Sequence, residues 1–454
     1  MPGLGLSLRL GRNRLAGLPA FVRAFIKRVT DDGGTVESPN CIKIPSGITP
    51  DFLYIPGSSK TEKIYSQLPK DGSGDVSGYT RSSTVLSVGS DGFLQSNAVN
   101  DPAHSYLFGS CPELQIQNYA LTNLTSDSNE FDAATWGDFG VSLADTSAQS
   151  PDGTVNAWLV TNDDTGVTSH GVRNSENPTT IPGRWYYHSV FAKLPSGSSC
   201  TGVYMTNAAE SGMNAYFNLI NGTVGTTAAN TKFANIYDYG NGWYRCMFAF
   251  EAGTTIAQLN IRLVIGNQVI TFNGDGSESL YLFGAETVQN GTTGYATYGE
   301  YIPTSGSVAS VSGDASADFS LPSGGATQGS FVFHGRITDT ITAVFINFGS
   351  SDQSNRGRIN VLGNQKPTYF SVNTGYMTQN TAVDNFEEFK LGVSVDNSGN
   401  VSLFFNGVLT DDAVNALHQF DQIQIAGGFT KHIKSMAWYS EKLSDAEMIT
   451  LTTL

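Results

Sequence analysis

The chain has 454 residues, of which 39% are hydrophobic and 14% charged, which excludes a disordered chain and leaves room for two or three domains with buried cores. Its formal net charge of −15 argues against a nucleic-acid partner, because phosphate binding requires clustered Lys and Arg. Its 50 glycines, together with many Ser, Thr and Asn, favour short strands joined by turns over helices.

Residues 1–30 are predicted to form a basic arm, because the first 28 residues include six basic and no acidic side chains. The basic residues interrupt the apolar ones, so no signal peptide is expected, and no later stretch approaches the roughly 20 apolar residues of a membrane span. The pattern "LPAFVRAFIKRV" predicts a short helix with Phe21, Ala24, Phe25 and Val29 at helical spacing. A positive arm on an acidic protein suits docking to a neighbouring protein, and the expected anchoring residues are Arg9, Arg12, Arg14, Phe21 and Phe25.

Residues 31–120 are rich in turns such as "KDGSGD" and predict a small irregular β connector. Residues 121–304 alternate strands and turns and predict a first β-sandwich or jelly roll. In "HSVFAKL", for example, Val190, Ala192 and Leu194 share one face. The expected strands are "NAWLVT", "RWYYHSVFAKL", "TGVYMT", "NAYFNLINGTVG", "GWYRCMFAFEAG", "QLNIRLVI" and "SLYLFGAETV".

Residues 301–328 are rich in Ser, Gly and Ala and predict a linker or domain edge, and residues 305–454 predict a second β-sandwich. Its clearest hairpin is "KLGVSVDNSGNVSLFFNGVL", with "DNSGN" as the turn. The helix "SDAEMITL" is expected to close the chain, with Ser444 as N-cap and Glu447 at the capping-box position. The predicted fold class is therefore mostly β, with an arm and a connector followed by two sandwiches.

Four cysteines, Cys41, Cys111, Cys200 and Cys246, lie far apart without a CxxC pair, so neither a zinc site nor a redox motif is indicated. The spacing favours buried reduced thiols. Whether Cys200 and Cys246 lie close enough to pair stays open at this point.

Residues 63–136 are similar to a stretch that recurs in bacteriophage virion proteins. The recurrent phrases correspond to Leu68–Asp75 ("LPKDGSGD"), Arg81–Thr84, Asp91–Leu94, Asn123–Leu124 and Trp136. Two positions depart from that pattern, because Ser82 replaces the usual Ala and Phe93 is interposed in the third phrase.

The rest of the chain continues this resemblance. The phrases "SPDGTVNAWLV", "YYHSVFAKL", "FNLINGTVGT", "GNGWYRCMFAF" and "YIPTSG" look like the carbohydrate-binding-module-like jelly roll of phage tail and head fibres. The phrases "VSLFFNGVL" and "WYSEKLSDAEMITL" resemble laminin-G or concanavalin-like lectin sandwiches. The resemblance covers about residues 60–454 and implies a virion protein without specifying which part of the virion.

Two aromatic phrases could be sugar-stacking sites or strand beginnings. In "DYGNGWYR", alternation places Trp243, Arg245 and Met247 on one face of a strand, and we favour the structural interpretation for this phrase and for "RWYYH". Ligand contacts are expected instead in loops at the sandwich ends. The candidates are Tyr204 and Tyr216 around "TNAAESGMNAY", and Asp352, Asn355 and Arg356 in "GSSDQSNRGR".

No enzyme is predicted. The acidic pairs Asp163–Asp164, Glu387–Glu388 and Asp411–Asp412 are adjacent in sequence, and neighbours on a strand point to opposite faces. The sequence contains no HExxH and no GxSxG, and it lacks the internal period of a β-helix depolymerase. No cofactor and no metal site is predicted, although a loop calcium stays open.

The sequence thus predicts a non-enzymatic structural protein of the bacteriophage virion, a tail fibre or spike whose lectin-like domains bind host-surface polysaccharide. The resemblance implies a homotrimer in contact with tail, portal, collar or capsid proteins. The alternatives are an architectural head fibre, capsid decoration or collar protein, and a glycan-degrading tailspike. The sequence favours no particular sugar or host, and it does not distinguish head from tail.

Overall fold

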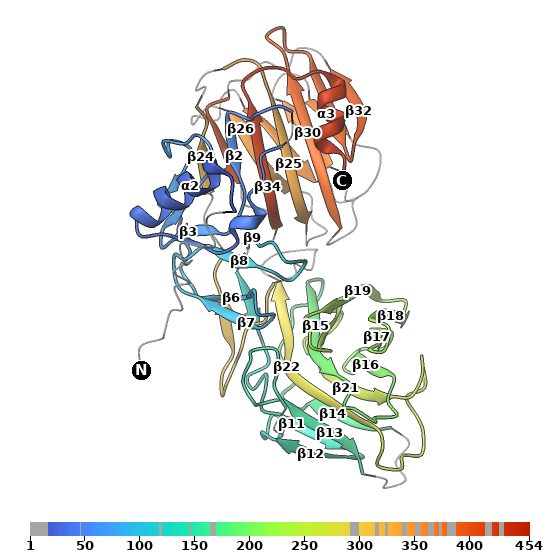
Figure 1. Cartoon of the computed structure of the whole chain (residues 1–454). Helices are drawn as coiled ribbons and strands as arrows, with labels where there is room; N and C mark the ends of the chain where they lie inside the picture. Colours follow the sequence, from blue (N-terminus) through green and yellow to red (C-terminus); the bar gives the residue numbers. More distant parts are fainter. Residues whose placement is uncertain are drawn as a thin grey trace. The chain divides into compact units, whose positions relative to one another are not determined.

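The computed structural model describes residues 17–45, 47–117, 120–145, 148–163, 169–290, 299–313, 317–322, 326–337, 343–349, 356–361, 367–371, 375–378, 387–413, 420–425 and 431–454. The chain divides into two compact units (Figure 1). Unit 1 comprises Met1–Ser83, Asn97–Asn118 and Asp314–Leu454, and unit 2 comprises Thr84–Ser96 and Tyr119–Gly313. The described residues are mostly β, which confirms the predicted fold class.

The core of unit 1 lies between two antiparallel sheets. The eight-stranded sheet has the order β32 (Val408–Ala413), β31 (Val401–Phe405), β30 (Glu388–Val395), β25 (Gly329–Ile337), β34 (Lys431–Tyr439), β9 (Glu113–Ile116) and β8 (Ala103–Ser105), with β2 (Phe52–Tyr54) also paired to β34. The six-stranded sheet has the order β24 (Ala317–Ser320), β33 (Gln422–Ile425), β26 (Ala343–Gly349), β27 (Arg356–Val361), β28 (Pro367–Ser371) and β29 (Gly375–Thr378).

The structure corrects the predicted division into four segments. Residues 31–120 do not form a separate connector, because β2, β8 and β9 belong to the same sheet as the C-terminal strands. In β2, for example, Leu53 pairs with Ala437 of β34. Short strands such as these leave backbone groups that need partners, and the C-terminal sheet supplies them. The same segment adds a small sheet of β1 (Thr35–Val36), β3 (Ser58–Lys60), β4 (Lys63–Ile64) and β5 (Val76–Ser77), together with the 3₁₀ turn η1 (Pro39–Cys41).

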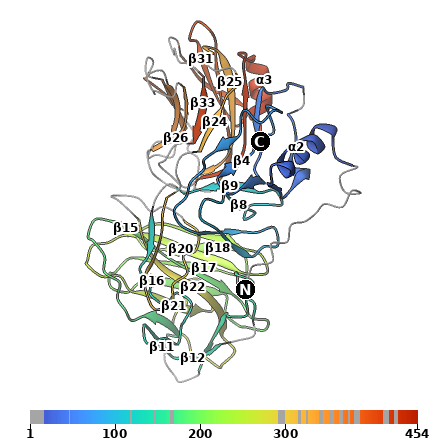
Figure 2. The same ribbon diagram turned by 90° about the vertical axis from the view of Figure 1, so that its left-hand side faces the viewer.

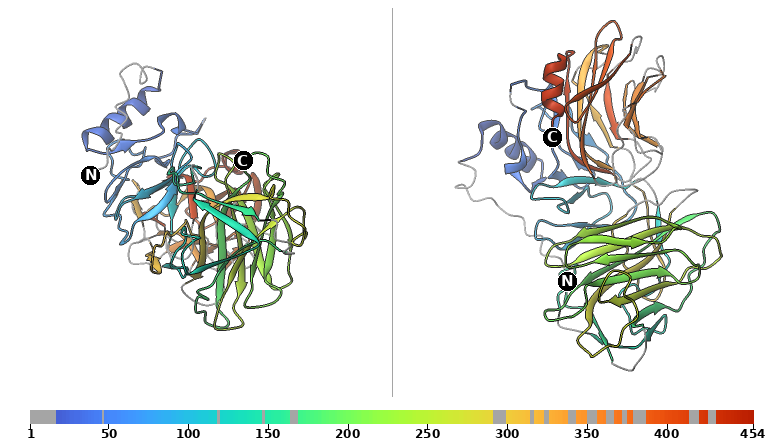
Figure 3. Two further views of the ribbon diagram at one scale, coloured as in Figure 1. Left: turned by 90° about the horizontal axis from the view of Figure 1, so that it is seen from below. Right: turned by 90° about the vertical axis from the view of Figure 1, so that its right-hand side faces the viewer.

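Two helices, α2 (Ala20–Asp31) and α3 (Asp445–Thr452), cover the outer face of the eight-stranded sheet, opposite the six-stranded sheet (Figures 2 and 3). A Cβ at Gly392 of β30 would lie 2.6 Å from the terminal methyl of Met448, so glycine there allows α3 to approach the sheet closely. Neither helix has the length and apolar character needed to cross a membrane, and the described part of the chain contains no other that does.

The predicted arm helix exists, but its apolar face is buried within unit 1. Val22, Phe25, Ile26 and Val29 are buried in one apolar cluster that also contains Leu53 of β2, Val332 of β25 and Ala437 of β34. Ala24, which was expected on the apolar face, is exposed, and Phe21 is only partly buried. Phe25 therefore stabilises the fold and is not free for anchoring, while Arg9, Arg12 and Arg14 lie outside the described residues.

The predicted C-terminal hairpin and helix cap are confirmed. Strands β30 and β31 pair antiparallel, and Asp396 accepts hydrogen bonds from the backbone of Ser398 and Asn400 in the turn. Ser444 and Glu447 form a reciprocal capping box at the start of α3.

Unit 2 is a sandwich of two further antiparallel sheets with its own core. The larger sheet contains β12 (Val141–Asp145), β13 (Trp158–Asn162), β22 (Ser279–Asn290), β15 (Trp185–Lys193), β20 (Tyr244–Glu251) and β19 (Thr231–Asp238), extended by β10 (Leu121–Asn123) and β23 (Ala309–Val311). The six-stranded sheet has the order β11 (Trp136–Phe139), β14 (Gly171–Asn174), β21 (Leu259–Val264), β16 (Gly202–Asn207), β17 (Asn214–Asn218) and β18 (Thr223–Thr227). Strands β6 (Val85–Val88) and β7 (Leu94–Asn97) form a two-stranded ribbon.

Six of the seven strand phrases predicted between residues 121 and 304 each contain one strand of the structure, whereas "NAYFNLINGTVG" is a hairpin of β17 and β18. The predicted linker is not one, because Tyr301 and Ile302 are buried in unit 2 and β23 pairs with β10. The boundary between the units falls inside the predicted linker, between Gly313 and Asp314. The predicted boundary between residues 304 and 305 therefore lies too early, because a composition rich in Ser and Gly does not exclude strand pairing such as that of β23 with β10.

The cysteine prediction was wrong for one pair. Cys41 and Cys111 form a disulfide across a sequence separation of 70 residues. Cys200 and Cys246 are buried free thiols, and burial raises the pKa of both. The pairing could not be predicted from spacing, because it requires the register of the 31–120 segment on the C-terminal sheet.

Candidate functional site

The phrase "GNGWYR" is part of the core of unit 2 and not a sugar platform. Trp243 is 2% exposed, and its Nε1 donates to the carbonyl oxygen of Gln149 at 3.0 Å. Arg245 is fully buried and pairs with Glu286 at 2.7 Å. The structural interpretation is thus confirmed for this phrase, and it extends to "RWYYH", in which Tyr186, Tyr187 and His188 are buried.

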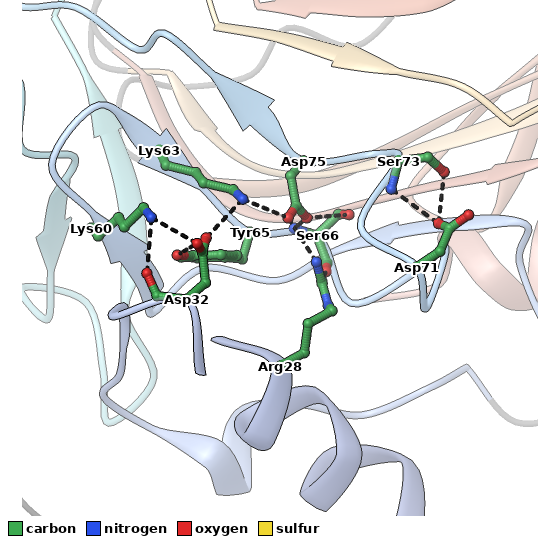
Figure 4. Close-up of polar contacts among 9 residues, drawn as sticks. All are labelled: Arg28, Asp32, Lys60, Lys63, Tyr65, Ser66, Asp71, Ser73 and Asp75. Atoms are coloured by element: carbon green, nitrogen blue, oxygen red, sulfur yellow. Dashed lines mark hydrogen bonds and ion pairs between the residues drawn. The ribbon is translucent and has the colours of Figure 1, made fainter. Parts of the chain in front are cut away.

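The phrase "LPKDGSGD" also has a structural role, which Figure 4 shows. Its last residue, Asp75, accepts hydrogen bonds from the backbone and the hydroxyl of Ser66. The other carboxylate oxygen of Asp75 accepts from Arg28 of α2 at 2.7 Å and lies 3.5 Å from Lys63. The phrase therefore fixes α2 to the small sheet of unit 1.

A second carboxylate holds the end of the same helix. Asp32, which follows α2, accepts from Lys63 at 2.9 Å and from the Tyr65 hydroxyl at 2.7 Å, and lies 3.0 Å from Lys60 (Figure 4). The hydrogen bond from Lys63, together with those from Tyr65 and Lys60, lowers the pKa of Asp32 below its usual value. Every charged group in this cluster has a partner, so the cluster offers no open site for a ligand.

A different arrangement exists on the outer face of the six-stranded sheet of unit 2, formed by β11, β14, β21, β16, β17 and β18 (Figure 1). Val203, Met205 and Phe217 point into the core, so alternation places Tyr204 and Tyr216 on the outer face. Tyr204 and Tyr216 are direct cross-strand partners, and their ring centroids are 4.5 Å apart. We call this surface the tyrosine face, defined by Phe139, Arg262, Tyr204 and Tyr216.

Arg262 of β21 supplies a cation to the tyrosine face. It is the register partner of Tyr204, and its guanidinium carbon lies 5.8 Å from the Tyr204 ring centroid and 5.7 Å from that of Phe139. Among the described residues, its Nε is buried without a hydrogen-bond partner. The guanidinium is therefore positioned by ring contacts. Because its Nε exposes less than 1 Å² of surface, only its terminal nitrogens can donate to a ligand.

A cavity of about 240 Å³ adjoins Tyr216. Asn267, one of its lining residues, is fixed by hydrogen bonds with the Thr226 backbone and hydroxyl. The cavity is smaller than the ~300–1,000 Å³ of drug-sized sites, so it suits a single ring or a similarly small group. Its lining residues are Thr201, Tyr216, Phe217, Asn218, Thr223, Gly225, Val264, Gly266 and Asn267.

Tyr204 and Tyr216 are only 9% and 8% exposed, so the tyrosine face presents small parts of two packed rings beside the partly exposed Arg262 and Phe139. Burial raises the pKa of Tyr216, so its hydroxyl is protonated and can donate at neutral pH. Rings that stack and groups that donate in fixed directions are the features that bind a ligand with both apolar and hydroxylated surfaces.

The structure brings two of the five predicted glycan-binding residues into contact. Tyr204 and Tyr216 meet, although they lie in strands β16 and β17 and not in a loop as predicted. Asp352 and Asn355 lie outside the described residues, as does the side chain of Arg356, whose backbone begins β27. Sequence reasoning missed Arg262, although the alternation in "QLNIRLVI" already put it on the polar face of its strand.

Within the described residues, no group of three or more His, Cys, Asp or Glu side chains could hold a metal ion. Several of the carboxylates in this part of the chain form ion pairs with basic side chains instead. Glu388, for example, binds Arg336 and Lys434.

No family model matches the chain, and no curated protein matches it. Parts of it are similar to solved structures of carbohydrate-binding, lectin-like and receptor-binding domains. One is the CBM40 of a Ruminococcus gnavus IT-sialidase bound to α2,3-sialyllactose. It is 18% identical with a TM-score of 0.25, and the match covers 28% of this chain and 84% of the CBM40 chain. A heptameric SAP-like pentraxin from Limulus polyphemus is 11% identical with a TM-score of 0.24, and the match covers 28% of this chain and 70% of the pentraxin chain. The receptor-binding domain of botulinum neurotoxin D is 13% identical with a TM-score of 0.25, and the match covers 30% of this chain and 40% of the toxin domain. At these TM-scores the similarities carry no argument about the function of this chain.

Proposed function

We propose that the chain is a non-catalytic bacteriophage virion protein, a tail fibre or spike, whose unit 2 binds host-surface saccharide at the tyrosine face. The observation that carries the proposal is the register-matched row of Arg262, Tyr204 and Tyr216 on an outer sheet face. The ordered phrases between residues 63 and 136, which resemble virion proteins, support the assignment to a particle.

The chemistry of the row suits a saccharide. The exposed parts of Tyr204 and Tyr216 offer an apolar contact to a sugar, although each ring is more than nine-tenths buried, and Arg262 offers donors to its hydroxyl or carboxylate oxygens. A face of this size gives weak binding per site, so several copies on one particle would supply avidity. Homotrimerisation and attachment to tail, portal, collar or capsid proteins are the parts of the proposal that rest on the resemblance alone.

The binding proposal is tested with the full-length chain on an array of bacterial surface polysaccharides. The variants are Tyr204→Ala and Tyr216→Ala, and the matched control is Tyr281→Ala, a half-buried tyrosine on the other sheet of unit 2. We expect loss of binding on the order of tenfold for both site variants and none for the control, because a lost ring contact is worth ~1 kcal/mol or more. Binding that is equal in all three variants would contradict the proposal.

Two further outcomes separate the alternatives. Release of reducing ends from a bound polysaccharide would make the protein a glycan-degrading tailspike. Cryo-EM of the intact particle distinguishes a fibre from an architectural protein. The tyrosine face must be open to solvent in a fibre, whereas in a head-fibre, decoration or collar protein it would be covered by neighbouring subunits.

A further inference from the structure

Unit 1 contains a cavity of about 480 Å³ that none of the motifs discussed above uses. Three parts of the unit enclose it: the outer face of the eight-stranded sheet, the Cys41–Cys111 disulfide with the residues that follow Cys41, and the last turn of α3. This volume lies within the ~300–1,000 Å³ typical of small-molecule sites. The cavity belongs to unit 1 alone and is separate from the tyrosine face of unit 2.

The walls of this cavity are largely apolar. Leu53 and Ile55 come from the N-terminal part of the chain, Val332 and Ala437 from the sheet, and Leu451 from α3. Burying an apolar body against them is favoured by ~25 cal/mol for each Å² removed from water. The walls therefore suit an aliphatic or aromatic group.

The polar lining is basic, in a protein whose net charge is −15. Lys43, Lys390 and Lys434 line the cavity, and no Asp or Glu does. Lys434 is paired with Glu388 at 2.7 Å, whereas the Lys390 ammonium donates to the carbonyl oxygen of Thr453. Within the described part of the chain, neither Lys390 nor Lys43 forms an ion pair with a carboxylate; burial lowers the pKa of Lys390, and the charge of nearby Glu388 opposes that lowering.

The remaining basic lining group, His334, contributes no positive charge at neutral pH. Burial lowers the pKa of His334 to about 4, and its Nε2 lies 2.6 Å from Glu388 Oε1. Glu388 is also bonded to Arg336 at 2.6 Å, so this carboxylate is fully engaged beside the cavity. The lysines are therefore the charges that a ligand would meet.

Tyr439 gives a second and independent indication of a ligand. It lines the cavity and is 2% exposed, yet among the described residues its hydroxyl has no hydrogen-bond partner. A buried hydroxyl without a partner destabilises a fold, and most such groups in proteins are satisfied. The hydroxyl oxygen exposes less than 1 Å² of surface, so a ligand oxygen in the cavity would satisfy it once the side chain turns toward the cavity.

We propose that this cavity binds an amphipathic anion, a carboxylate, sulfonate or phosphate monoester carried on an apolar body. The anionic group is held by Lys390 and Lys43, and the apolar body lies against Leu53, Val332 and Leu451. The Tyr439 hydroxyl meets a second polar atom of the ligand, because Tyr439 lies four residues along β34 from Ser435, which is level with Lys390. The proposal does not depend on saccharide binding by unit 2, and either can fail without the other.

The test uses the full-length protein and two probes, the fluorescent sulfonate 8-anilinonaphthalene-1-sulfonate and dodecanoate as its competitor. We expect the fluorescent sulfonate to bind at one site per chain and to be displaced by dodecanoate. Dodecanol, which has the same chain length but no charge, should displace it at least tenfold more weakly. The Lys390→Met and Tyr439→Phe variants should each bind dodecanoate more weakly, on the order of tenfold and threefold respectively. Lys232→Met, at a lysine of unit 2 paired with Glu251, is the control and should bind like the unaltered protein.

Tyr439→Phe keeps the test decisive should Lys390→Met fail to fold. Removing a hydroxyl that is hydrogen-bonded in the fold lowers the stability of the protein, whereas removing an unsatisfied hydroxyl does not. Tyr439→Phe should therefore unfold at the same temperature as the unaltered protein or at a higher one, while its affinity for dodecanoate falls. No saturable binding of either probe, equal displacement by dodecanol and dodecanoate, or unchanged affinity in both variants would overturn the proposal.

Discussion

Arg245 and Glu286 form an ion pair inside unit 2, with Nη2 and Oε2 2.7 Å apart and neither side chain exposed to solvent. Glu286 also accepts hydrogen bonds from the Ser189 hydroxyl and the Ile302 backbone. Arg245 donates in addition to the carbonyl oxygen of Gly299. The pair thus joins β20, β15 and β22 to the segment that leaves the sandwich. Arg245 also lies 3.8 Å from the buried Glu300, so the arginine offsets the cost of burying two carboxylates.

Removing one member of this pair is expected to destabilise unit 2 strongly. Arg245→Met leaves Glu286 buried without its counter-ion, which costs about 3–5 kcal/mol, whereas the Arg245→Met, Glu286→Met double variant should recover part of that loss. Urea unfolding followed by tryptophan fluorescence measures this, since Trp136, Trp158, Trp185 and Trp243 all lie in unit 2. A loss below about 1 kcal/mol in the single variant would show that the pair is hydrated in solution.

The Arg245–Glu286 pair illustrates how far the sequence could predict the site. Alternation placed Arg245 on one face of its strand, but a period of two residues does not distinguish the core face from the solvent face when the residue is charged. Only the register of β20 on β15, and of β15 on β22, brings Glu286 to the arginine. For the same reason Arg262 was missed, because its role arises from its cross-strand partner Tyr204.

Features encoded locally were predicted well, and features that depend on long-range pairing were not. The hairpin at Asp396 and the capping box at Ser444 involve residues within a few positions of each other, so spacing alone identifies them. The Cys41–Cys111 disulfide and the pairing of β2 with β34 join distant segments, and composition contains no information on either.

Asp75→Asn is expected to loosen α2 from unit 1. The change removes the charge that holds Arg28 and Lys63, while the hydrogen bonds from Ser66 can persist. Asp75 is 4% exposed, so its pair with Arg28 is shielded from solvent and should contribute about 1–3 kcal/mol to docking of the helix. Hydrogen exchange followed by mass spectrometry should show faster exchange in peptides covering α2.

Asp71→Asn is the matched control for this experiment, because Asp71 lies in the same phrase but its hydrogen bonds go only to Ser73, and its charge acts on Arg28 less strongly than on Ser73 (Figure 4). Its effect on exchange in α2 should be negligible. Equal effects of the two substitutions would mean that α2 is held by its apolar face alone.

The buried His188 makes unit 2 less stable in mild acid. Burial lowers the pKa of His188 to about 3 from 6.5, so in the unfolded chain the imidazole takes up a proton first as the pH falls. The contribution of His188 to the free energy of unfolding is therefore fully present above about pH 6.5 and is lost as the pH falls toward 3. Between pH 7 and pH 5 the loss is about 2 kcal/mol. His188→Gln should reduce the pH dependence of urea unfolding by that amount, and an unchanged slope would contradict the burial of a neutral imidazole.

The disulfide is expected to stabilise unit 1 chiefly by restricting the unfolded chain. For a closed loop of about 70 residues the chain-entropy argument gives about 4 kcal/mol. Thermal unfolding of the Cys41→Ala, Cys111→Ala double variant should therefore occur at lower temperature than that of the oxidised protein. A reductant should shift the unaltered protein toward the variant and leave the variant itself unchanged, and peptide mapping without reductant should recover the linked pair.

Arg262→Met separates a binding role from a structural one at the tyrosine face. Arg262 has no ion pair with any described carboxylate, and its contacts to Phe139 and Tyr204 are partly replaced by the thioether of Met. The free energy of unfolding should therefore change by less than about 1 kcal/mol. Saccharide binding should weaken by about tenfold, because the donors aimed at the ligand are lost. A change in unfolding that is larger than the change in binding would make Arg262 a residue of the scaffold, and the tyrosine pair alone would then have to account for recognition.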